Sequence, residues 1–257
     1  MPAAQTPRPL TIITGASRGM GLAMAEQLLD AGHELVCISR KPNAALAQHA
    51  ARAGRECEQW PQDLARAEAA AARLEGWLAT RDGTAHSSVT LINNAGLLPR
   101  VAPLRDIPHG ELSEAIRVDL EAPMLLACVF LRATEGWKIA RRILNISSGL
   151  GRRAMASQAA YCAAKAGMDH FSRCVALEEA GKPHGARICS LAPGVIDTDM
   201  QSHLRAADPT RFPDMATFVG YRDRGMLSTP AEAAARVLAY LARPDFGADP
   251  VADVRDN

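Results

Sequence analysis

Short apolar runs alternate with longer amphipathic segments along the chain. The short runs predict buried strands, and the longer segments, whose apolar positions recur with helical spacing, predict helices. The predicted strands cover residues 10–14, 35–39, a weak run near Cys57, 89–93, 142–147 and 187–191. The predicted helices cover residues 19–30, 44–53, 64–80, a long segment after His109, 157–179 and a segment from about Pro230.

This alternation predicts the fold class. Strands separated by crossover helices form a parallel sheet that helices cover on both faces. We therefore expect an α/β protein: a single Rossmann-type domain over residues 1–257, doubly wound around a mainly parallel, seven-stranded sheet. The pattern breaks at about residues 194–228, where Pro, Gly, Asp and Arg are scattered. That stretch is expected to form a substrate loop or lid.

Composition and charge narrow the range of partners. The net charge is +1 and the two signs are interspersed, unlike the one-signed surfaces that attract nucleic acid or anionic membranes. The six cysteines are widely spaced without a C-x-x-C pair, and the histidines form no metal-binding motif, so reduced thiols and no metal site are expected. We recognise no signal sequence or membrane span. These features predict a soluble cytoplasmic protein that acts on a small molecule.

A glycine-rich turn follows the first predicted strand. The run Gly15-Ala16-Ser17-Arg18-Gly19-Met20-Gly21 has the spacing G-x-x-x-G-x-G at the start of a predicted helix. Glycines let the backbone approach a pyrophosphate, and the helix N-terminus offers free N–H groups and a favourable dipole. Such turns also occur as plain tight turns. The strand, loop and helix context favours a dinucleotide site that includes Ser17, Arg18 and Met20.

The end of the second predicted strand indicates which dinucleotide binds. NAD enzymes usually place an acid here to bind the ribose hydroxyls, whereas this chain has Ser39-Arg40-Lys41. Arg40 and Arg18 are suited to bind a 2′-phosphate through charge-assisted hydrogen bonds of about 1.5–3 kcal/mol each. The sequence therefore favours NADP(H). The alternative is that Arg40 is only a solvated residue at a strand end.

Tyr161 and Lys165 are four residues apart on a predicted helix and so share one face. A phenol with its ordinary pKa of about 10 is a slow acid or base at neutral pH, but an adjacent ammonium favours the phenolate. Ser148, at the end of a predicted strand, offers a hydroxyl to the same substrate oxygen, and its spacing to Tyr161 favours it over Ser147. The trio predicts carbonyl reduction, in which Tyr161 protonates the oxygen as hydride reaches the carbon.

With these motifs the chain resembles the short-chain dehydrogenase/reductase family over nearly its whole length. Residues 93–96 resemble the family's N-N-A-G, which stabilises the central sheet and contacts the cofactor, and Asp63 resembles the acid that receives the adenine amino group. Residues 193–198 resemble P-G-x-x-x-T, which holds the nicotinamide amide. The cofactor contacts that the resemblance implies are Asp63, Leu64, Asn93, Ala95, Gly96, Tyr161, Lys165, Pro193, Gly194, Val195 and Thr198. It also implies a homodimer or homotetramer, because the family's long helices pair across a two-fold axis.

One position departs from the family pattern. The family's fourth catalytic residue is an Asn whose main-chain carbonyl holds a water linked to the lysine, and Asp119 stands at the matching site. Asp119 can keep that backbone role, and its carboxylate can also raise the pKa of Lys165. A catalytic and a purely structural role both stay open here.

Three segments resemble the sepiapterin reductase and benzil reductase branch of the family: residues 134–138, 161–162 and 197–201. That branch reduces carbonyls next to another carbonyl or imine with NADPH. Asp253 resembles the tail acid that holds the guanidine-like edge of a pterin in sepiapterin reductases, although a tail acid can also be a solvated charge. The resemblance implies an NADPH-dependent carbonyl reductase that acts on an activated ketone, a dicarbonyl or a pterin side chain.

Two other functions fit parts of the pattern. A non-catalytic, NADPH-binding sensor or scaffold would share the fold, but such relatives typically lose the Tyr or the Lys, and this chain has both. A sugar-nucleotide epimerase or dehydratase shares the glycine loop and Y-x-x-x-K, but has another glycine spacing and a larger C-terminal substrate domain. A carbonyl reductase is therefore the primary hypothesis.

Overall fold

A parallel sheet forms the centre of the protein in the computed structural model, which describes residues 6–256. Its seven strands have the order β3-β2-β1-β4-β5-β6-β7. The strands are β1 (Arg8–Thr14), β2 (Glu34–Ser39), β3 (Cys57–Pro61), β4 (His86–Asn93), β5 (Ala140–Ile146), β6 (Arg187–Ala192) and β7 (Val251–Asp253). The helices are α1 (Gly19–Asp30), α2 (Ala44–Ala53), α3 (Ala67–Ala79), α4 (His109–Ile116), α5 (Ala122–Ala133), α6 (Ala159–Glu179), α7 (Asp199–Arg205), α8 (Met215–Asp223) and α9 (Pro230–Leu241). The predicted doubly wound α/β fold is confirmed.

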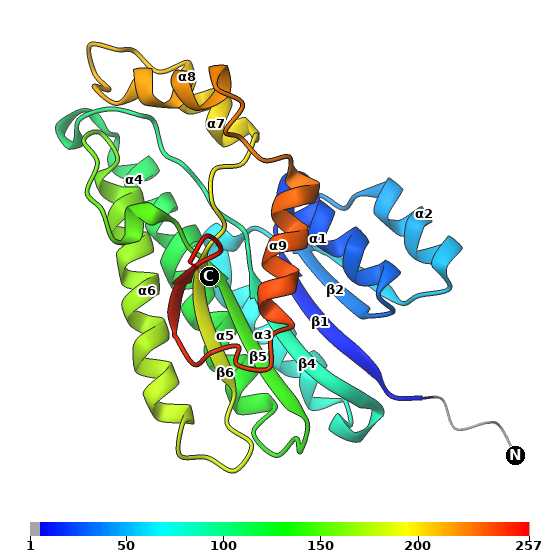
Figure 1. The fold of residues 1–257 in the computed structure, drawn as a ribbon. Helices are drawn as coiled ribbons and strands as arrows, with labels where there is room; N and C mark the ends of the chain where they lie inside the picture. Colours follow the sequence, from blue (N-terminus) through cyan, green and yellow to red (C-terminus); the bar gives the residue numbers. More distant parts are fainter. Residues whose placement is uncertain (1–5, 257) are drawn as a thin grey trace, which may run out of the picture.

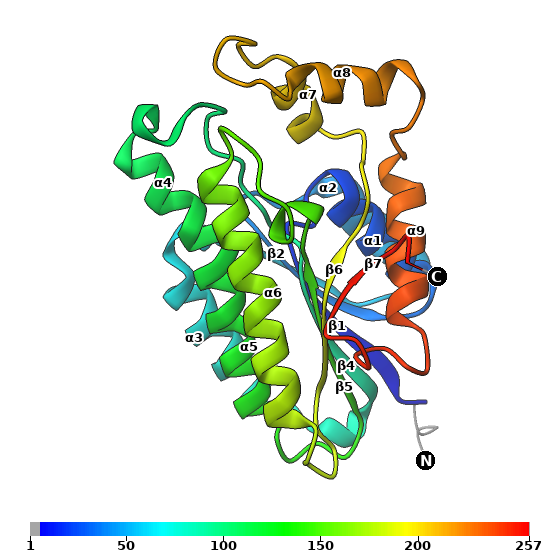
Figure 2. The same ribbon diagram turned by 60° about the vertical axis from the view of Figure 1, so that its left-hand side comes forward.

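Helices cover both faces of the sheet (Figures 1 and 2). On one face α3, α5 and α6 pack over a core that includes the buried Trp60 and Phe130. On the other face α1, α2 and α9 pack over a second core that includes Met24 and Leu29. Most positions of β1, β4 and β5 are accordingly buried, because a strand covered on both faces has no side open to solvent.

The strand order reverses beside β1. From β1 the chain builds outward through β2 and β3, and then returns to place β4 on the other side of β1. The loops that follow β1 and β4 therefore part at the carboxyl edge of the sheet, and this is where open α/β sheets form a ligand crevice.

Two predicted helices have irregular turns. The segment predicted as one helix over residues 64–80 begins with a 3-10 turn, Leu64–Arg66, before α3. The long helix predicted after His109 consists of α4 and α5 joined by a π-helical turn, Arg117–Glu121. Single π-helical turns are rare and often mark functional sites.

The stretch predicted as a loop or lid contains two helices, α7 and α8, which lie above the carboxyl edge of the sheet (Figure 1). Leu204, Phe212 and Phe218 form a small core of their own between them. This segment, called the lid below, is thus folded, and its action as a substrate lid stays a prediction. Within residues 6–256, no helix is sufficiently long and apolar to span a membrane.

Candidate active site

A cavity of about 1080 Å³ opens at the carboxyl edge of the sheet, under α7 and α8. The loops after β1, β2, β4, β5 and β6 line it together with the C-terminal segment. Every residue that the sequence predicts as a catalytic or cofactor contact lines this cavity, with the exception of Asn93. The fold therefore brings together motifs that are spread over most of the chain.

The glycines of the first loop have backbone conformations and contacts that require glycine. Gly15 and Gly19 have φ angles of +71° and +57°, in the left-handed region. A Cβ on Gly21 would lie 2.2 Å from the main-chain oxygen of Gly15. The loop is thus held tightly against the N-terminus of α1, where an anion is favoured.

Asn94, rather than Asn93, fastens this loop to the end of β4. The Asn94 side chain donates from Nδ2 to the main-chain oxygens of Thr14, at 2.9 Å, and Gly15, at 3.3 Å. Asn93 is buried in the sheet and donates to Oδ1 of Asn145 at 2.8 Å. The predicted cofactor contact of Asn93 stays a prediction, and the Asn93 side chain points to the neighbouring strand and not into the cavity.

Arg40 and Lys41 follow Ser39 directly and lie on the cavity wall. No acidic residue stands at this end of β2. Arg18, in the glycine loop, also lines the cavity and forms an ion pair with Asp199 in the first turn of α7. Both partners are largely exposed, at 71% and 78% of their side-chain surface. The ion pair links the glycine loop to the lid.

Tyr161, Ser148 and Lys165 meet in the same cavity. Tyr161 and Lys165 lie one turn apart on α6, with Nζ of Lys165 5.5 Å from the centre of the Tyr161 ring. Burial and the nearby Asp119 carboxylate raise the pKa of Tyr161, and a hydrogen bond with the Ser148 hydroxyl opposes this rise. Burial lowers the pKa of Lys165.

The two neighbouring serines have different surroundings. The Ser147 hydroxyl donates to Oδ1 of Asp169 at 2.5 Å and is buried. The Ser148 hydroxyl accepts a hydrogen bond from the main-chain N–H of Leu150 at 3.2 Å, on the cavity wall. Ser148 is thus the serine whose hydroxyl lies beside Tyr161.

Asp119 lies in the π-helical turn, fully buried. Its Oδ1 accepts a hydrogen bond of 2.8 Å from the main-chain N–H of Leu97, while Oδ2 has no hydrogen-bond partner within residues 6–256. Burial raises the pKa of Asp119 to about 6, against the opposing effects of Lys165 and the Leu97 N–H. The carboxylate is therefore an electrostatic neighbour of the Tyr161 and Lys165 pair.

Asp253 ends β7 and is 5% exposed, so it is not the solvated tail acid that the sequence left open. It lines the cavity, and both of its carboxylate oxygens accept hydrogen bonds from the Arg255 guanidinium, at 2.7 and 2.6 Å. The Asp253 carboxylate is thus already paired with the guanidinium of Arg255, a group similar to the pterin edge that it was expected to bind.

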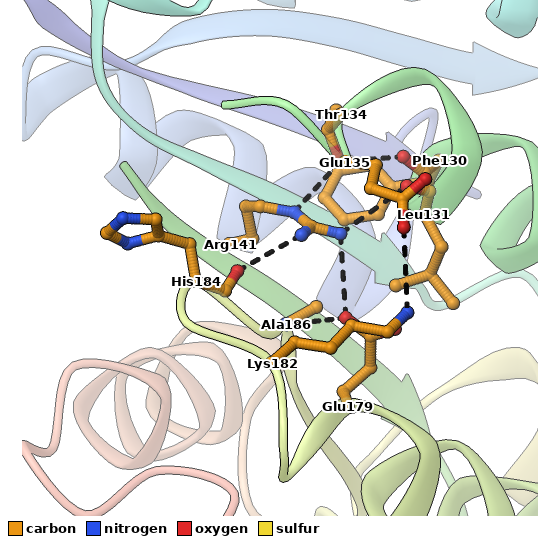
Figure 3. Close-up of polar contacts among 9 residues, drawn as sticks. All are labelled: Phe130, Leu131, Thr134, Glu135, Arg141, Glu179, Lys182, His184 and Ala186. Carbon is orange, nitrogen blue, oxygen red and sulfur yellow. Dashed lines mark hydrogen bonds and ion pairs between the residues drawn. The ribbon is translucent and has the colours of Figure 1, made fainter. Parts of the chain in front are cut away.

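Residues 134–138, which resemble the sepiapterin and benzil reductase branch, lie at the opposite edge of the sheet. Thr134 accepts a hydrogen bond from the buried Arg141, which pairs with Glu179 (Figure 3). Trp137 stacks on His86, with ring centres 5.9 Å apart. This segment therefore holds the fold together and is remote from the cavity, whereas residues 197–201 line it.

Three residues around the site have roles that sequence reasoning missed. Asn94 was visible in N-N-A-G, and Asp169 stands one helical turn after Lys165 on the same face. Gln158 lines the cavity three residues before Tyr161 and is 2% exposed. Helical spacing from Tyr161 and Lys165 was the signal that could have found the last two.

Comparisons with known proteins show the family of this chain. The model of the short chain dehydrogenase family matches residues 9–209. A benzil reductase ((S)-benzoin forming) of Bacillus cereus is 33% identical over 235 residues, which cover 91% of this chain and 94% of the relative. A sepiapterin reductase of Xenopus laevis is 31% identical over 214 residues, covering 78% and 79%. The crystal structure of a putative NAD(P) dependent gluconate 5-dehydrogenase from Beutenbergia cavernae, with bound NADP at low occupancy, is 28% identical and matches with a TM-score of 0.78 over 98% of this chain and 96% of its own.

Proposed function

Because the chain belongs to the short-chain dehydrogenase family, we propose that it is an NADPH-dependent carbonyl reductase with Tyr161 as the proton donor. One observation carries the proposal. Tyr161, Ser148 and Lys165 share a single cavity with the glycine loop after β1. A ketone bound in this cavity could therefore contact both the proton donor Tyr161 and a dinucleotide held by the glycine loop.

The cavity residues fit a dinucleotide with a 2′-phosphate. The close approach of Gly21 to Gly15 leaves room for a pyrophosphate against the N-terminus of α1. Arg40 and Lys41 place positive charge at the end of β2, where an acid would favour NAD(H), and Arg18 adds a positive charge from the glycine loop. When bound, NADPH supplies the hydride. The cofactors bound by relatives support a nicotinamide dinucleotide, and the charge at Arg40 supports the phosphorylated form.

The protein's part of the reaction is to hold and protonate the substrate oxygen. Ser148 donates a hydrogen bond to that oxygen, and Tyr161 gives it a proton as negative charge develops. The Lys165 ammonium stabilises the phenolate that Tyr161 becomes. Its Nζ also donates to the main-chain oxygen of Ile146 at 3.0 Å, which fixes its direction.

We propose an aromatic 1,2-diketone as the substrate class. The benzil reductases of Bacillus cereus and Bacillus subtilis, 33% and 32% identical to this chain, support this choice. Met155, Leu204 and Phe218 give the substrate end of the cavity an apolar wall. A pterin would have to displace Arg255 from Asp253, so the diketone is favoured over a pterin side chain.

The sequence resemblance also leads us to propose a homo-oligomer. Met124 on α5 and Leu177 on α6 are 42% and 80% exposed, on the two helices that pair across a two-fold axis in the family. Sedimentation velocity would test this proposal, and a monomer at micromolar concentration would contradict it.

A substrate panel tests the proposed reaction. NADPH oxidation is followed with benzil, sepiapterin and simple ketones, for wild type, Tyr161→Phe and the matched control Tyr240→Phe on α9. We expect turnover of benzil by wild type and the control, and a loss of at least roughly 10²-fold in Tyr161→Phe. Tight NADPH binding without turnover of any carbonyl would instead favour the sensor. Full activity of Tyr161→Phe would exclude Tyr161 as the proton donor.

A further inference from the structure

Asp169 is a buried carboxylate next to the candidate active site that does not line the cavity. It lies on α6 and is 1% exposed. Its Oδ1 accepts hydrogen bonds from the hydroxyls of Ser147, at 2.5 Å, and Ser190, at 2.7 Å. Its Oδ2 has no hydrogen-bond partner within residues 6–256 and lies 3.5 Å from Nε of Arg152. Burying a carboxylate is costly, and the two hydroxyls and the Arg152 guanidinium offset this cost only in part.

Asp169 and Lys165 form hydrogen bonds with two consecutive residues at the end of β5, Ser147 and Ile146. They are one helical turn apart and share a face of α6. Lys165 donates to the main-chain oxygen of Ile146, and Asp169 accepts from the side chain of the next residue, Ser147. Ser148 follows directly. The position of the Ser148 hydroxyl is thus determined by two contacts with the helix that carries Tyr161.

The turn on the other side of Ser148 is also fitted against Asp169. Ser148 caps the 3-10 turn Gly149–Gly151. A Cβ on Gly151 would lie 2.7 Å from Oδ2 of Asp169 and 3.0 Å from the main-chain oxygen of Lys165. Only glycine lets the turn pack this closely. Asp169 therefore contacts the chain on both sides of Ser148: it accepts a hydrogen bond from Ser147 before it, and Gly151 packs against its carboxylate after it.

The charged groups around Lys165 are few. Asp119 faces it from the π-helical turn, and Asp169 from its own helix; both raise the pKa of Lys165 against the larger effect of burial. Around Asp169 lie Arg152 and, from β6, Ser190 and the thiol of Cys189. Asp169 thus acts electrostatically on both Lys165 and Arg152.

We propose that Asp169 is a positioning residue of the reductase, which fixes the strand end that carries Ser148 and holds a negative charge one helical turn from Lys165. The inference rests on the proposed function for its catalytic meaning. The contacts of Asp169 with Ser147 and Ser190 do not depend on the substrate. Both parts can therefore be tested separately.

The titration of Lys165 tests the charge directly. The chain has four lysines, Lys41, Lys138, Lys165 and Lys182, so the NMR signals of labelled lysine side chains can be assigned by substitution. Asp169→Asn should lower the pKa of Lys165, because a nearby negative charge is removed. Arg152→Met should raise it, because a competing positive charge is removed. Unchanged Lys165 titration in both folded variants would overturn the proposed charge effect, whether or not the protein reduces any ketone.

Kinetics test the positioning. In Asp169→Asn the alkaline limb of kcat/KM for benzil reduction should move to lower pH by the same amount. Ser147→Ala keeps the charge but loses the grip on the strand end, so it should lower kcat roughly tenfold without moving that limb. The Kd for NADPH should stay within about twofold in Asp169→Asn, because Asp169 does not line the cavity. A uniform loss at every pH in Asp169→Asn, or wild-type kcat in Ser147→Ala, would overturn the assignment. Absence of wild-type turnover would count against the proposed function alone.

Discussion

The guanidinium of Arg141 lies 3.6 Å from the carboxylate of Glu179 in the interior, with 2% and 3% of their side-chain surfaces exposed (Figure 3). Arg141 also donates to Thr134, His184 and Leu131, and Glu179 accepts from the main-chain N–H of Ala186 at 2.8 Å. The pair joins the connections before β5 and β6, far from the cavity.

Glu179→Gln should therefore destabilise the protein strongly. It leaves the Arg141 charge buried without its counter-charge, which typically costs about 3–5 kcal/mol. For a chain of this size that corresponds to a fall in Tm of roughly 10 °C. Differential scanning calorimetry measures it. The control is Lys182→Met, since Lys182 also contacts Glu179 but is 44% exposed, and its loss should cost less than about 1 kcal/mol. Equal Tm values for the two variants would show that the buried Arg141–Glu179 pair contributes no more to stability than the exposed Lys182–Glu179 contact.

Cofactor preference should depend on Arg40. Arg40→Asp places an acid at the end of β2, which repels a 2′-phosphate and can accept hydrogen bonds from ribose hydroxyls. Loss of one charge-assisted hydrogen bond of about 1.5–3 kcal/mol lowers kcat/KM for NADPH by roughly 10- to 100-fold, and repulsion adds to this loss. The value for NADH should stay level or rise.

The matched control for this prediction is Arg52→Ala. Arg52 is an exposed arginine in the last turn of α2 and does not line the cavity. Steady-state kinetics with both cofactors should leave its NADPH preference unchanged. If Arg40→Asp retains the wild-type preference for NADPH, Arg40 is only a solvated residue at a strand end.

Asp119→Asn should change how stability depends on pH. Burial raises the pKa of Asp119 to about 6, so the folded protein holds this proton more tightly than the unfolded chain. The resulting stability is fully present below about pH 4 and is lost as the pH rises to about 6. The asparagine variant has no such loss. Relative to wild type it should therefore gain up to about 3 kcal/mol in free energy of unfolding between pH 4 and pH 8. Urea unfolding across this range measures the gain, and a constant difference would contradict the raised pKa.

The sequence predicts the fold and most of the site because both depend on local patterns. The alternating apolar runs give the strand and helix order, and the glycine loop and Y-x-x-x-K are short motifs with direct physical reasons. For Asp169 the only local signal is its helical spacing from Lys165, and this spacing does not reveal its partners. The hydroxyls of Ser147 and Ser190 that donate to it come from strands far away in the sequence, so only the folded structure shows them.

The lid is the second element that the pattern does not resolve. Helices α7 and α8 are short and weakly amphipathic, and their small core depends on Phe212 and Phe218, whose rings lie 5.5 Å apart. Such a unit is stabilised by tertiary contacts more than by helix propensity. The π-helical turn at Asp119 was likewise hidden, because residues 117–121 contain no proline or glycine that would mark an irregular turn.

Gln158 offers a test of the cost of an unsatisfied amide. It is 2% exposed, and neither atom of its side-chain amide has a hydrogen-bond partner among residues 6–256. A buried polar group without a partner costs about 1–3 kcal/mol. Gln158→Leu replaces the amide by an apolar group of similar size and should therefore raise the Tm of the cofactor-free protein. Gln27→Leu is the matched control. Nε2 of Gln27 donates to the main-chain oxygen of Ala231 at 3.0 Å near the surface, so the Tm of this variant should stay level or fall slightly.

The same substitution should affect activity, because Gln158 lines the cavity three residues before Tyr161. The stabilised Gln158→Leu variant should reduce benzil more slowly, as expected where a protein keeps an unsatisfied group for its ligand. A lower Tm for Gln158→Leu than for Gln27→Leu would show that the amide is satisfied in solution.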